Sequence, residues 1–333
     1  MRVLFYGTPD FAVPSLTALV GEGFDVAAVV TRPDKPTGRH RSSADASPVK
    51  LAALDEDIPV LQPDSPSAPD FLAEVRTLKP EVAIVVAYGH LLKTDLLGIP
   101  AHGSLNLHAS LLPRLRGAAP IERAILEGFT ETGVSIMKME AGLDTGPVLH
   151  IARTPIAADE TGGELRARLA EIGAMALIEA LTLLGESPVE PTPQDHAAAT
   201  LAPKLTRAEE RIDWTQSAAQ VSRKIRAFDP RPGAWTEIRG KPVKLFGARA
   251  GNRHQEGQRP EAEVASGQSG RRMEDAITTL AAPGTIMAVG EKLIIACADG
   301  IVGVTDVQPA GKARMTVRDF LNGRGAAEGD VLR

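Results

Sequence analysis

Three short apolar runs, separated by helical patterns, constrain the fold of this chain more than any other feature. The runs are residues 2–7 (RVLFYG), 25–31 (DVAAVVT) and 81–89 (EVAIVVAYG), each bounded by turn-forming residues. Helical patterns lie between them, at residues 11–23, 47–57 and 68–79. Continuously apolar strands that alternate with helices are typical of a parallel sheet covered on both faces. We therefore predict a doubly wound α/β domain with a mostly parallel sheet.

The remainder of the chain has a different pattern, which predicts a second domain. A length of 333 residues exceeds the roughly 100–200 residues of a typical single domain. Residues 185–206 are rich in proline and polar side chains without sustained periodicity, and they predict a linker. Short apolar runs follow, separated by turn signals, and predict a small antiparallel β-barrel. We expect domains at 1–184 and 207–333, with a mobile surface insertion at the polar residues 252–276.

The charge is unevenly distributed between the two parts of the chain. Residues 1–206 hold 17 Lys and Arg against 26 Asp and Glu, a net charge of −9, whereas residues 207–333 hold 20 against 16, a net charge of +4. The overall charge of −5 argues against a simple nucleic-acid binder. The positive excess of the second part leaves two interpretations open, namely chance variation and an anionic partner.

Cysteine usage and hydropathy bound the compartment. A lone cysteine, Cys297, excludes an internal disulfide framework and fits a reducing environment. The first residues are too short an apolar run for a signal peptide, and no uninterrupted run of about 18 apolar residues occurs. We predict a cytoplasmic protein that does not span a membrane.

An asparagine and a histidine share one face of a further predicted strand, residues 104–110 (SLNLHAS). Strand alternation places Asn106 and His108 on one face and the two leucines of the run on the other. Pro113 and the basic residues after it end the strand before a helical pattern begins near residue 118. The two polar side chains would then lie beside a loop that could form a pocket. The alternative is a structural histidine with satisfied hydrogen bonds.

A carboxylate that could complete this site lies in MEAGLDTGPVL, residues 139–149. The glycines on both sides of Asp144 indicate a backbone conformation that other residues would resist, and the alternative is a simple turn residue. With Asn106 and His108, it would supply an amide donor, an imidazole and a carboxylate that orients the imidazole and stabilises its charged form. The spacing of His102 and His108 matches no common zinc motif, so we predict no metal.

The ends of the first two apolar runs bear on the class of ligand. The first ends in GTPDFA, which lacks the second glycine of a G-x-G-x-x-G fingerprint, and this argues against a nicotinamide dehydrogenase. The second leads into a long loop that carries Lys35, Arg39 and Arg41. Such a loop is either an inert connection or an element that grips an anionic partner.

Taken together, these motifs resemble the folate-dependent formyltransferase family. The resemblance covers nearly the whole chain, through FYGTPDFAVPSL, PDKPTGR, NLHASLLPRLRGAAP, ETGVSIMKMEAGLDTGPVL, KLTRAEERIDW and IRAFDPRPGAW. It implies transfer of the formyl group of 10-formyltetrahydrofolate to the α-amino group of methionine on initiator methionyl-tRNA, for translation initiation. A nucleotide-sugar amine or water is the alternative acceptor, and a non-catalytic RNA-binding module is the alternative class. PDKPTGR and the basic second part argue against the two other acceptors.

The resemblance also implies roles for individual residues. Asn106 and protonated His108 would donate hydrogen bonds to the oxygen of a tetrahedral intermediate, and Asp144 would sustain the imidazolium. The backbone of four consecutive residues would line the folate pocket: Ser110, Leu111, Leu112 and Pro113. Ala109 stands where the family commonly has glycine, and Leu115 where an aromatic residue is frequent.

For the RNA partner, the resemblance implies an OB-like C-terminal domain and two basic elements. The loop with Lys35, Arg39 and Arg41 would approach the acceptor end of the tRNA. A predicted helix within residues 211–228 carries the second set, Arg223, Lys224 and Arg226. We expect a monomer that does not bind DNA.

Overall fold

The computed structural model describes residues 1–36, 44–186, 190–251 and 281–333, which form two compact units. Unit 1 comprises Met1–Ala124, Phe129–Ala157 and Glu164–Lys204, and unit 2 comprises Ile125–Gly128, Ala158–Gly163 and Leu205–Arg333. The insertion predicted at 252–276 lies outside the described residues, as do Arg39 and Arg41. None of the described helices combines the length and apolar character that a membrane crossing needs.

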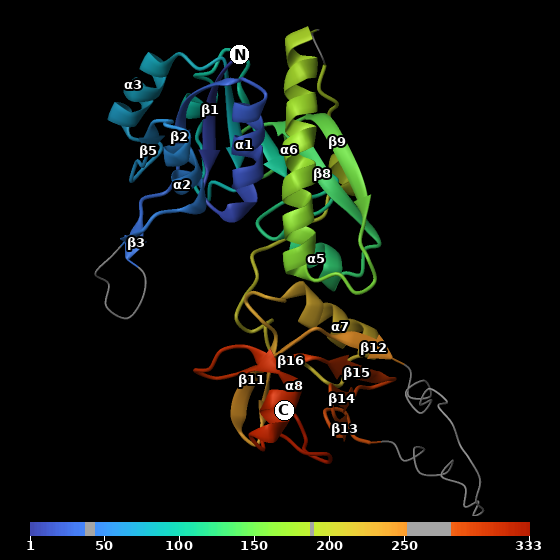
Figure 1. Ribbon diagram of the computed structural model, residues 1–333. Coiled ribbons are helices and arrows are strands. Elements are labelled where there is room, and N and C mark those ends of the chain that lie inside the picture. The colour runs from blue at the N-terminus through green and yellow to red at the C-terminus, as the bar shows by residue number, and fades with distance from the viewer. Residues whose placement is uncertain (37–43, 187–189, 252–280) are drawn as a thin grey trace, which may run out of the picture. The chain divides into compact units, whose positions relative to one another are not determined.

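Unit 1 is built on a seven-stranded sheet with the strand order β5-β2-β1-β6-β7-β8-β9 (Figure 1). The strands are β1 (Arg2–Gly7), β2 (Asp25–Val30), β5 (Val60–Leu61), β6 (Val82–Val86), β7 (Ser104–His108), β8 (Glu131–Lys138) and β9 (Val148–Pro155). The first five strands of that order pair in parallel, whereas β8 and β9 are antiparallel to their neighbours. The predicted doubly wound, mostly parallel sheet is confirmed.

Helices cover both faces of this sheet. They are α1 (Val13–Gly21), α2 (Pro48–Asp55), α3 (Pro69–Leu78), α4 (Thr94–Leu97), α5 (Pro120–Leu126) and α6 (Gly162–Glu186). One apolar cluster joins alternate residues of β1, β2 and β6 to α3 and to residues of α4. On the other face, a Cβ at Gly173 of α6 would lie 2.8 Å from Leu107 of β7, so α6 packs closely on the sheet at this glycine.

Local sequence signals explain where the predicted helices begin. Ser47 caps α2 by accepting a hydrogen bond from the Lys50 N–H at 3.1 Å, and Pro48 occupies the first helical position. A 3₁₀ turn (Asp10–Ala12) precedes α1. The short strands β3 (Lys35–Pro36) and β4 (Ala44–Asp45) pair with each other at the two ends of the basic loop.

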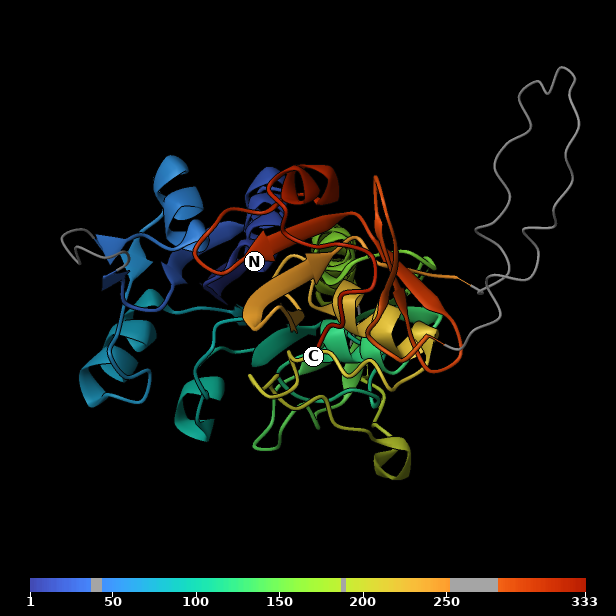
Figure 2. The same ribbon diagram turned by 90° about the horizontal axis from the view of Figure 1, so that it is seen from below.

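Unit 2 contains two four-stranded antiparallel sheets, which Figure 2 draws from a second direction. One has the order β10 (Trp235–Ile238), β11 (Lys241–Phe246), β16 (Asp306–Pro309), β17 (Met315–Thr316); the other has β12 (Arg249–Gly251), β15 (Ile301–Val304), β14 (Leu293–Ala296), β13 (Ile286–Val289). The predicted small antiparallel domain is confirmed.

Two helices accompany the sheets of unit 2, α7 (Ala218–Ala227) and α8 (Val317–Asn322). The helical pattern at 211–228 is helical only from Ala218, because Ser217 and Gln220 form a capping box that begins the helix there. Val221 and Ile225 form its buried face.

The segment predicted as a linker over 185–206 has a second role. Residues 190–204 belong to unit 1, where Thr192 pairs with Val148 and Leu201 pairs with Arg116. A short 3₁₀ helix, His196–Ala198, lies between these two pairs. The proline and polar residues of this segment follow no periodic pattern. The segment nevertheless forms hydrogen bonds with the loops that follow β7 and β8.

Candidate active site

The candidate site begins at β7, whose register sets the direction of its side chains. Asn106 pairs with Val85 of β6 and Met137 of β8, and His108 pairs with Ser135 of β8. Asn106 is half-buried, whereas Leu105 and Leu107 are buried on the opposite face. The carboxyl ends of β1, β6 and β7 meet at the same edge of the sheet, which is where ligands bind in doubly wound folds. Asn106 and His108 approach that edge.

His108 is held by an oxygen atom on each side of its ring. Only 6% of its side chain is exposed. Nε2 lies 2.9 Å from the Leu115 carbonyl oxygen, and since a carbonyl only accepts, Nε2 carries the proton of this hydrogen bond. Nδ1 faces the Asp144 carboxylate at 3.6 Å. Both ring nitrogens therefore face oxygen atoms that can accept a hydrogen bond.

Asp144 lies in a loop whose backbone is unusual, as its flanking glycines indicated. Asp144 itself has φ +50°, and its Oδ2 accepts a hydrogen bond from the Gly117 N–H at 2.8 Å. A Cβ at Gly146 would lie 1.8 Å from the Lys138 carbonyl oxygen, so only glycine allows this close approach to β8. The loop therefore brings a carboxylate to His108 across the end of the sheet.

The loop after β7 is fixed by Ser135, a fully buried residue of β8. The Ser135 hydroxyl donates to the Ser110 carbonyl oxygen at 2.7 Å and accepts from the Leu112 N–H at 3.1 Å. The Leu111 carbonyl accepts from Arg114 N–H at 3.1 Å. Several backbone groups of the segment expected to line a folate pocket are thus engaged within the protein. The side chains of Leu111 and Pro113 remain half-buried.

Residues 190–204 shape the same loop from the other side. The Thr200 hydroxyl accepts a hydrogen bond from the Leu115 N–H at 2.9 Å. The Thr200 carbonyl accepts one from the Arg116 N–H, also at 2.9 Å. A Cβ at Gly117 would lie 2.7 Å from the Ala202 carbonyl oxygen, and Gly117 has φ +121°. These contacts aim the Leu115 carbonyl at His108 and the Gly117 N–H at Asp144. The sequence pattern gave no signal for them.

Gln194, which also belongs to residues 190–204, lies at the site as well. It is buried and connects the Asp144 loop to Arg116, itself only 6% exposed. Arg116 also contacts Nδ1 of His196, at 3.3 Å. Neither Gln194 nor Ser135 was predicted to contribute to the site.

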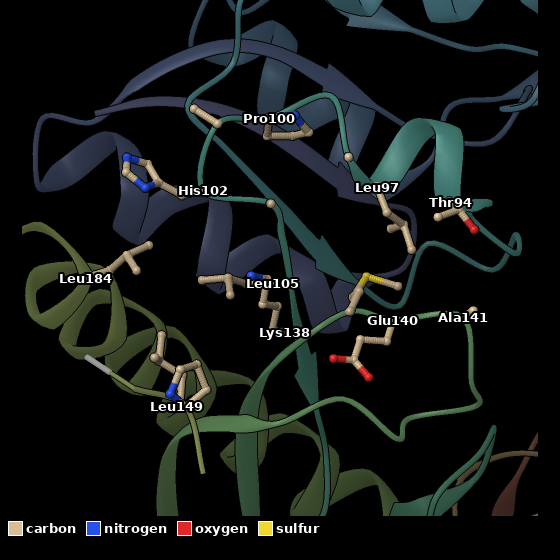
Figure 3. Close-up of a pocket in the computed structure, with 15 residues that line it drawn as sticks. Thr94, Leu97, Pro100, His102, Leu105, Lys138, Glu140, Ala141, Leu149 and Leu184 are labelled. Atoms are coloured by element: carbon tan, nitrogen blue, oxygen red, sulfur yellow. The ribbon is translucent and has the colours of Figure 1, made fainter. Parts of the chain in front are cut away.

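A cavity of about 670 Å³ lies near the beginning of β7 (Figure 3). Its lining includes Leu97 and Thr94 of α4, Leu184 of α6, and Leu105 and His102. Neither Asn106, His108 nor Asp144 lines it. Its lining also includes Met139, Glu140 and Ala141, which lead into the Asp144 loop.

The basic residues predicted to bind tRNA differ in their surroundings. The backbone of Lys35 lies in β3, and its side chain is outside the described part of the chain. Lys224 of α7 donates to the Arg211 carbonyl at 3.0 Å, and burial lowers the pKa of its amine. Arg223 is half-buried. Arg226, also predicted to contact RNA, is 8% exposed, and its guanidinium donates to the Glu160 carbonyl at 2.8 Å.

Burial also lowers the pKa of Arg226, which is the direction expected for a cation taken out of water.

Within the described ranges, no group of three or more His, Cys, Asp or Glu side chains is arranged to hold a metal ion.

Comparison with known proteins identifies the class. Residues 1–181 match the model of the formyl transferase family, and residues 204–325 match that of the formyl transferase C-terminal domain. The fold and the site thus define a formyl transferase.

Curated relatives narrow this class. The methionyl-tRNA formyltransferase of Ruegeria pomeroyi is 45% identical over 332 residues, covering 100% of both chains. That of Myxococcus xanthus is 44% identical and covers 98% of this chain and 96% of the relative. The chain belongs to the methionyl-tRNA formyltransferase family.

Solved structures share the fold at lower identity. HypX from Aquifex aeolicus in complex with tetrahydrofolic acid superposes with a TM-score of 0.61 at 21% identity, over 96% of this chain and 47% of that chain. The methionyl-tRNA formyltransferase from Clostridium thermocellum gives 0.55 at 15% identity, over 75% and 93%.

Proposed function

We propose that the protein transfers the formyl group of 10-formyltetrahydrofolate to the α-amino group of methionine on initiator methionyl-tRNA, giving N-formylmethionyl-tRNA for translation initiation. The observation that carries this proposal is the 45% identity with a methionyl-tRNA formyltransferase over the full length of both chains. Transfer to a nucleotide-sugar amine and hydrolysis of the donor are less favoured, because the relatives that match at full length share the name of the tRNA enzyme.

In the proposed reaction, the amine nitrogen attacks the formyl carbon and the new N–C bond forms. Negative charge develops on the formyl oxygen, and collapse of the tetrahedral intermediate breaks the bond from that carbon to N10 of the folate. The amine loses a proton and N10 gains one. Donors already in place around the oxygen lower the barrier most effectively, since they need no rearrangement during the step.

We assign Asn106, His108 and Asp144 to this step. Asn106 is half-buried at the ligand-binding edge of the sheet, so its amide N–H can reach a substrate oxygen. At His108, the substrate oxygen would replace the Leu115 carbonyl at Nε2, because a carbonyl is a weaker acceptor than an oxyanion. Asp144 would stay at Nδ1 and balance the imidazolium charge.

The folate contacts are proposed for side chains rather than backbone. The Ser110 carbonyl and the Leu112 N–H both form hydrogen bonds with the Ser135 hydroxyl, and Ser110 and Leu112 are buried. Leu111 and Pro113 have partly exposed apolar surface, which suits the flat rings of a folate-derived donor.

For the tRNA, we propose contacts from the loop with Lys35, Arg39 and Arg41 and from Arg223 and Lys224. We also propose a catalytic domain at residues 1–184, a tRNA-binding domain at 207–333, and action as a cytoplasmic monomer.

The test is transfer of labelled formyl from 10-formyltetrahydrofolate. Methionyl initiator tRNA should be labelled, whereas uncharged tRNA should not, and elongator methionyl-tRNA should be labelled more slowly. Asn106→Ala should lower kcat by about 10²–10³. His108→Ala should lose activity, whereas His102→Ala, at an exposed histidine of the same unit, should keep it. Release of formate without labelled tRNA would refute the acceptor, and labelling of a nucleotide-sugar amine instead would assign the alternative.

A further inference from the structure

Gln194 uses its whole hydrogen-bonding capacity on two loops of the candidate site. Its Nε2 donates to the Asp144 carbonyl at 2.9 Å and to the Gly146 carbonyl at 2.6 Å. Its Oε1 accepts from Nε of Arg116 at 3.1 Å and from Nη2 at 2.7 Å. Both partners of the amide nitrogen are carbonyls and both partners of the amide oxygen are guanidinium N–H groups, so only one amide orientation satisfies all four contacts.

The loop that carries Asp144 needs such a support. Asp144 has φ +50°. For a residue with a side chain this conformation is unfavourable in free energy, and it persists only where surrounding contacts determine it. Gln194 binds the loop at Asp144 itself and at Gly146, two residues later. A shift of this backbone would move the carboxylate away from its 3.6 Å contact with His108.

The other half of the amide connects to the loop after β7. Arg116 precedes Gly117, whose N–H binds the Asp144 carboxylate at 2.8 Å. Gln194 therefore joins the backbone that carries Asp144 to the residue beside the donor that binds Asp144. With 8% of its surface exposed, Gln194 makes these contacts away from bulk water, where an unmade hydrogen bond is expensive.

We propose that Gln194 is a positioning residue, which sets the place of the Asp144 carboxylate relative to His108 without touching substrate. This inference rests on the proposed function. It assigns a role in the reaction to residues 190–204, which lie on the chain between α6 and Leu205, where the longest part of unit 2 begins.

Two substitutions separate positioning from a purely structural role. Gln194→Ala removes all four hydrogen bonds. Gln194→Glu keeps the acceptors for Arg116 and adds a charge pair there, but it replaces both donors to the Asp144 loop by an oxygen that faces two carbonyls. The Glu variant should therefore stay folded while the loop loses its support. Gln308→Glu is the matched control, because Gln308 also donates its Nε2 to a backbone carbonyl, that of Lys312, at 3.0 Å on the surface of unit 2.

The measurement is steady-state formylation of methionyl initiator tRNA, with melting temperatures of every variant. Both Gln194 variants should lower kcat by about 10- to 100-fold, since misplacement of a reacting group by about 1 Å costs on the order of 10²-fold. The KM for each substrate should change by less than about 3-fold. In an Asp144→Asn background, Gln194→Glu should lower kcat by less than about 3-fold more, because residues that act through one another are not additive.

Full kcat in a folded Gln194→Glu variant would overturn the inference, as would a loss that multiplies undiminished with that of Asp144→Asn. An inactive wild-type protein would instead overturn the proposed function and this inference with it. An active wild type with an unaffected Glu variant overturns only the role of Gln194.

Discussion

Substituting Ser135→Ala removes one oxygen atom and leaves two buried backbone groups without their partner. The Ser135 hydroxyl lies on β8 opposite His108, is fully buried, and joins the Ser110 carbonyl to the Leu112 N–H. Alanine fits the same space, so no steric change accompanies the loss. The loop that follows His108 then has no hydrogen-bonded connection to β8 at these two positions.

The expected magnitude follows from the number of groups left unpaired. A buried polar group without a partner costs about 1–3 kcal/mol, and two such groups give a loss of about 3 kcal/mol in the free energy of unfolding. For a domain of about 150–250 residues, each kcal/mol lowers the melting temperature by about 2–4 °C, so a decrease of about 6–12 °C is expected. The kcat of formylation should fall as well, because the loop also carries Leu115 against His108.

The assay can separate the two units. Both tryptophans, Trp214 and Trp235, lie in unit 2, so tryptophan fluorescence follows unit 2 while far-ultraviolet circular dichroism follows both. Ser135→Ala should lower the melting temperature of unit 1, whose unfolding is followed by circular dichroism but not by tryptophan fluorescence. Ser65→Ala is the matched control, since Ser65 is exposed and its hydroxyl accepts a hydrogen bond from the Ser67 N–H at 3.3 Å, and it should change stability by less than about 0.5 kcal/mol. A loss below about 1 kcal/mol in Ser135→Ala would refute the reasoning.

Three further outcomes are expected. Tyr88→Phe should stabilise unit 1 by about 1 kcal/mol in thermal unfolding, because the buried Tyr88 hydroxyl has no hydrogen-bond partner among the described residues. Gly117→Ala should lower stability by about 3 kcal/mol and formylation by more than about 10-fold, because φ is +121° and a Cβ would lie 2.7 Å from the Ala202 oxygen; normal activity would contradict this. Arg226→Met should destabilise unit 2 by about 2 kcal/mol in tryptophan fluorescence, through loss of the contact with Glu160, and should leave the salt dependence of tRNA binding unchanged.

The parts of the fold that follow local periodicity could be predicted from the sequence. Strand alternation fixed which face of β7 carries Asn106 and His108, because it depends only on neighbouring residues. The glycines around Asp144 likewise indicated a constrained loop: Gly146 closely approaches the Lys138 carbonyl, and a Cβ at Gly142 would collide with the Thr145 side chain. The continuous apolar runs of β1, β2 and β6 indicated a sheet buried on both faces, as observed.

Burial of a charged helix residue could not be predicted in the same way. Arg223, Lys224 and Arg226 lie within one turn of α7, and a helical pattern alone does not show which of them packs against another part of the chain. Arg226 is buried because residues 158–163 belong to unit 2 and present the Glu160 carbonyl to it. That contact joins residues 66 positions apart, which no local pattern records.

The same reasoning explains why half of the candidate site escaped prediction. Asn106, His108 and Asp144 are chemically conspicuous, whereas the residues that hold them use ordinary amides and hydroxyls from distant positions. Gln194 is 78 residues from Arg116 and 50 from Asp144, in a segment whose composition indicates only a connection. In a site of this kind, local motifs reveal the reacting groups, whereas long-range hydrogen bonds determine the positions of those groups. Substitutions in residues 190–204 should therefore change kcat more than KM, although none of these residues is proposed to touch substrate.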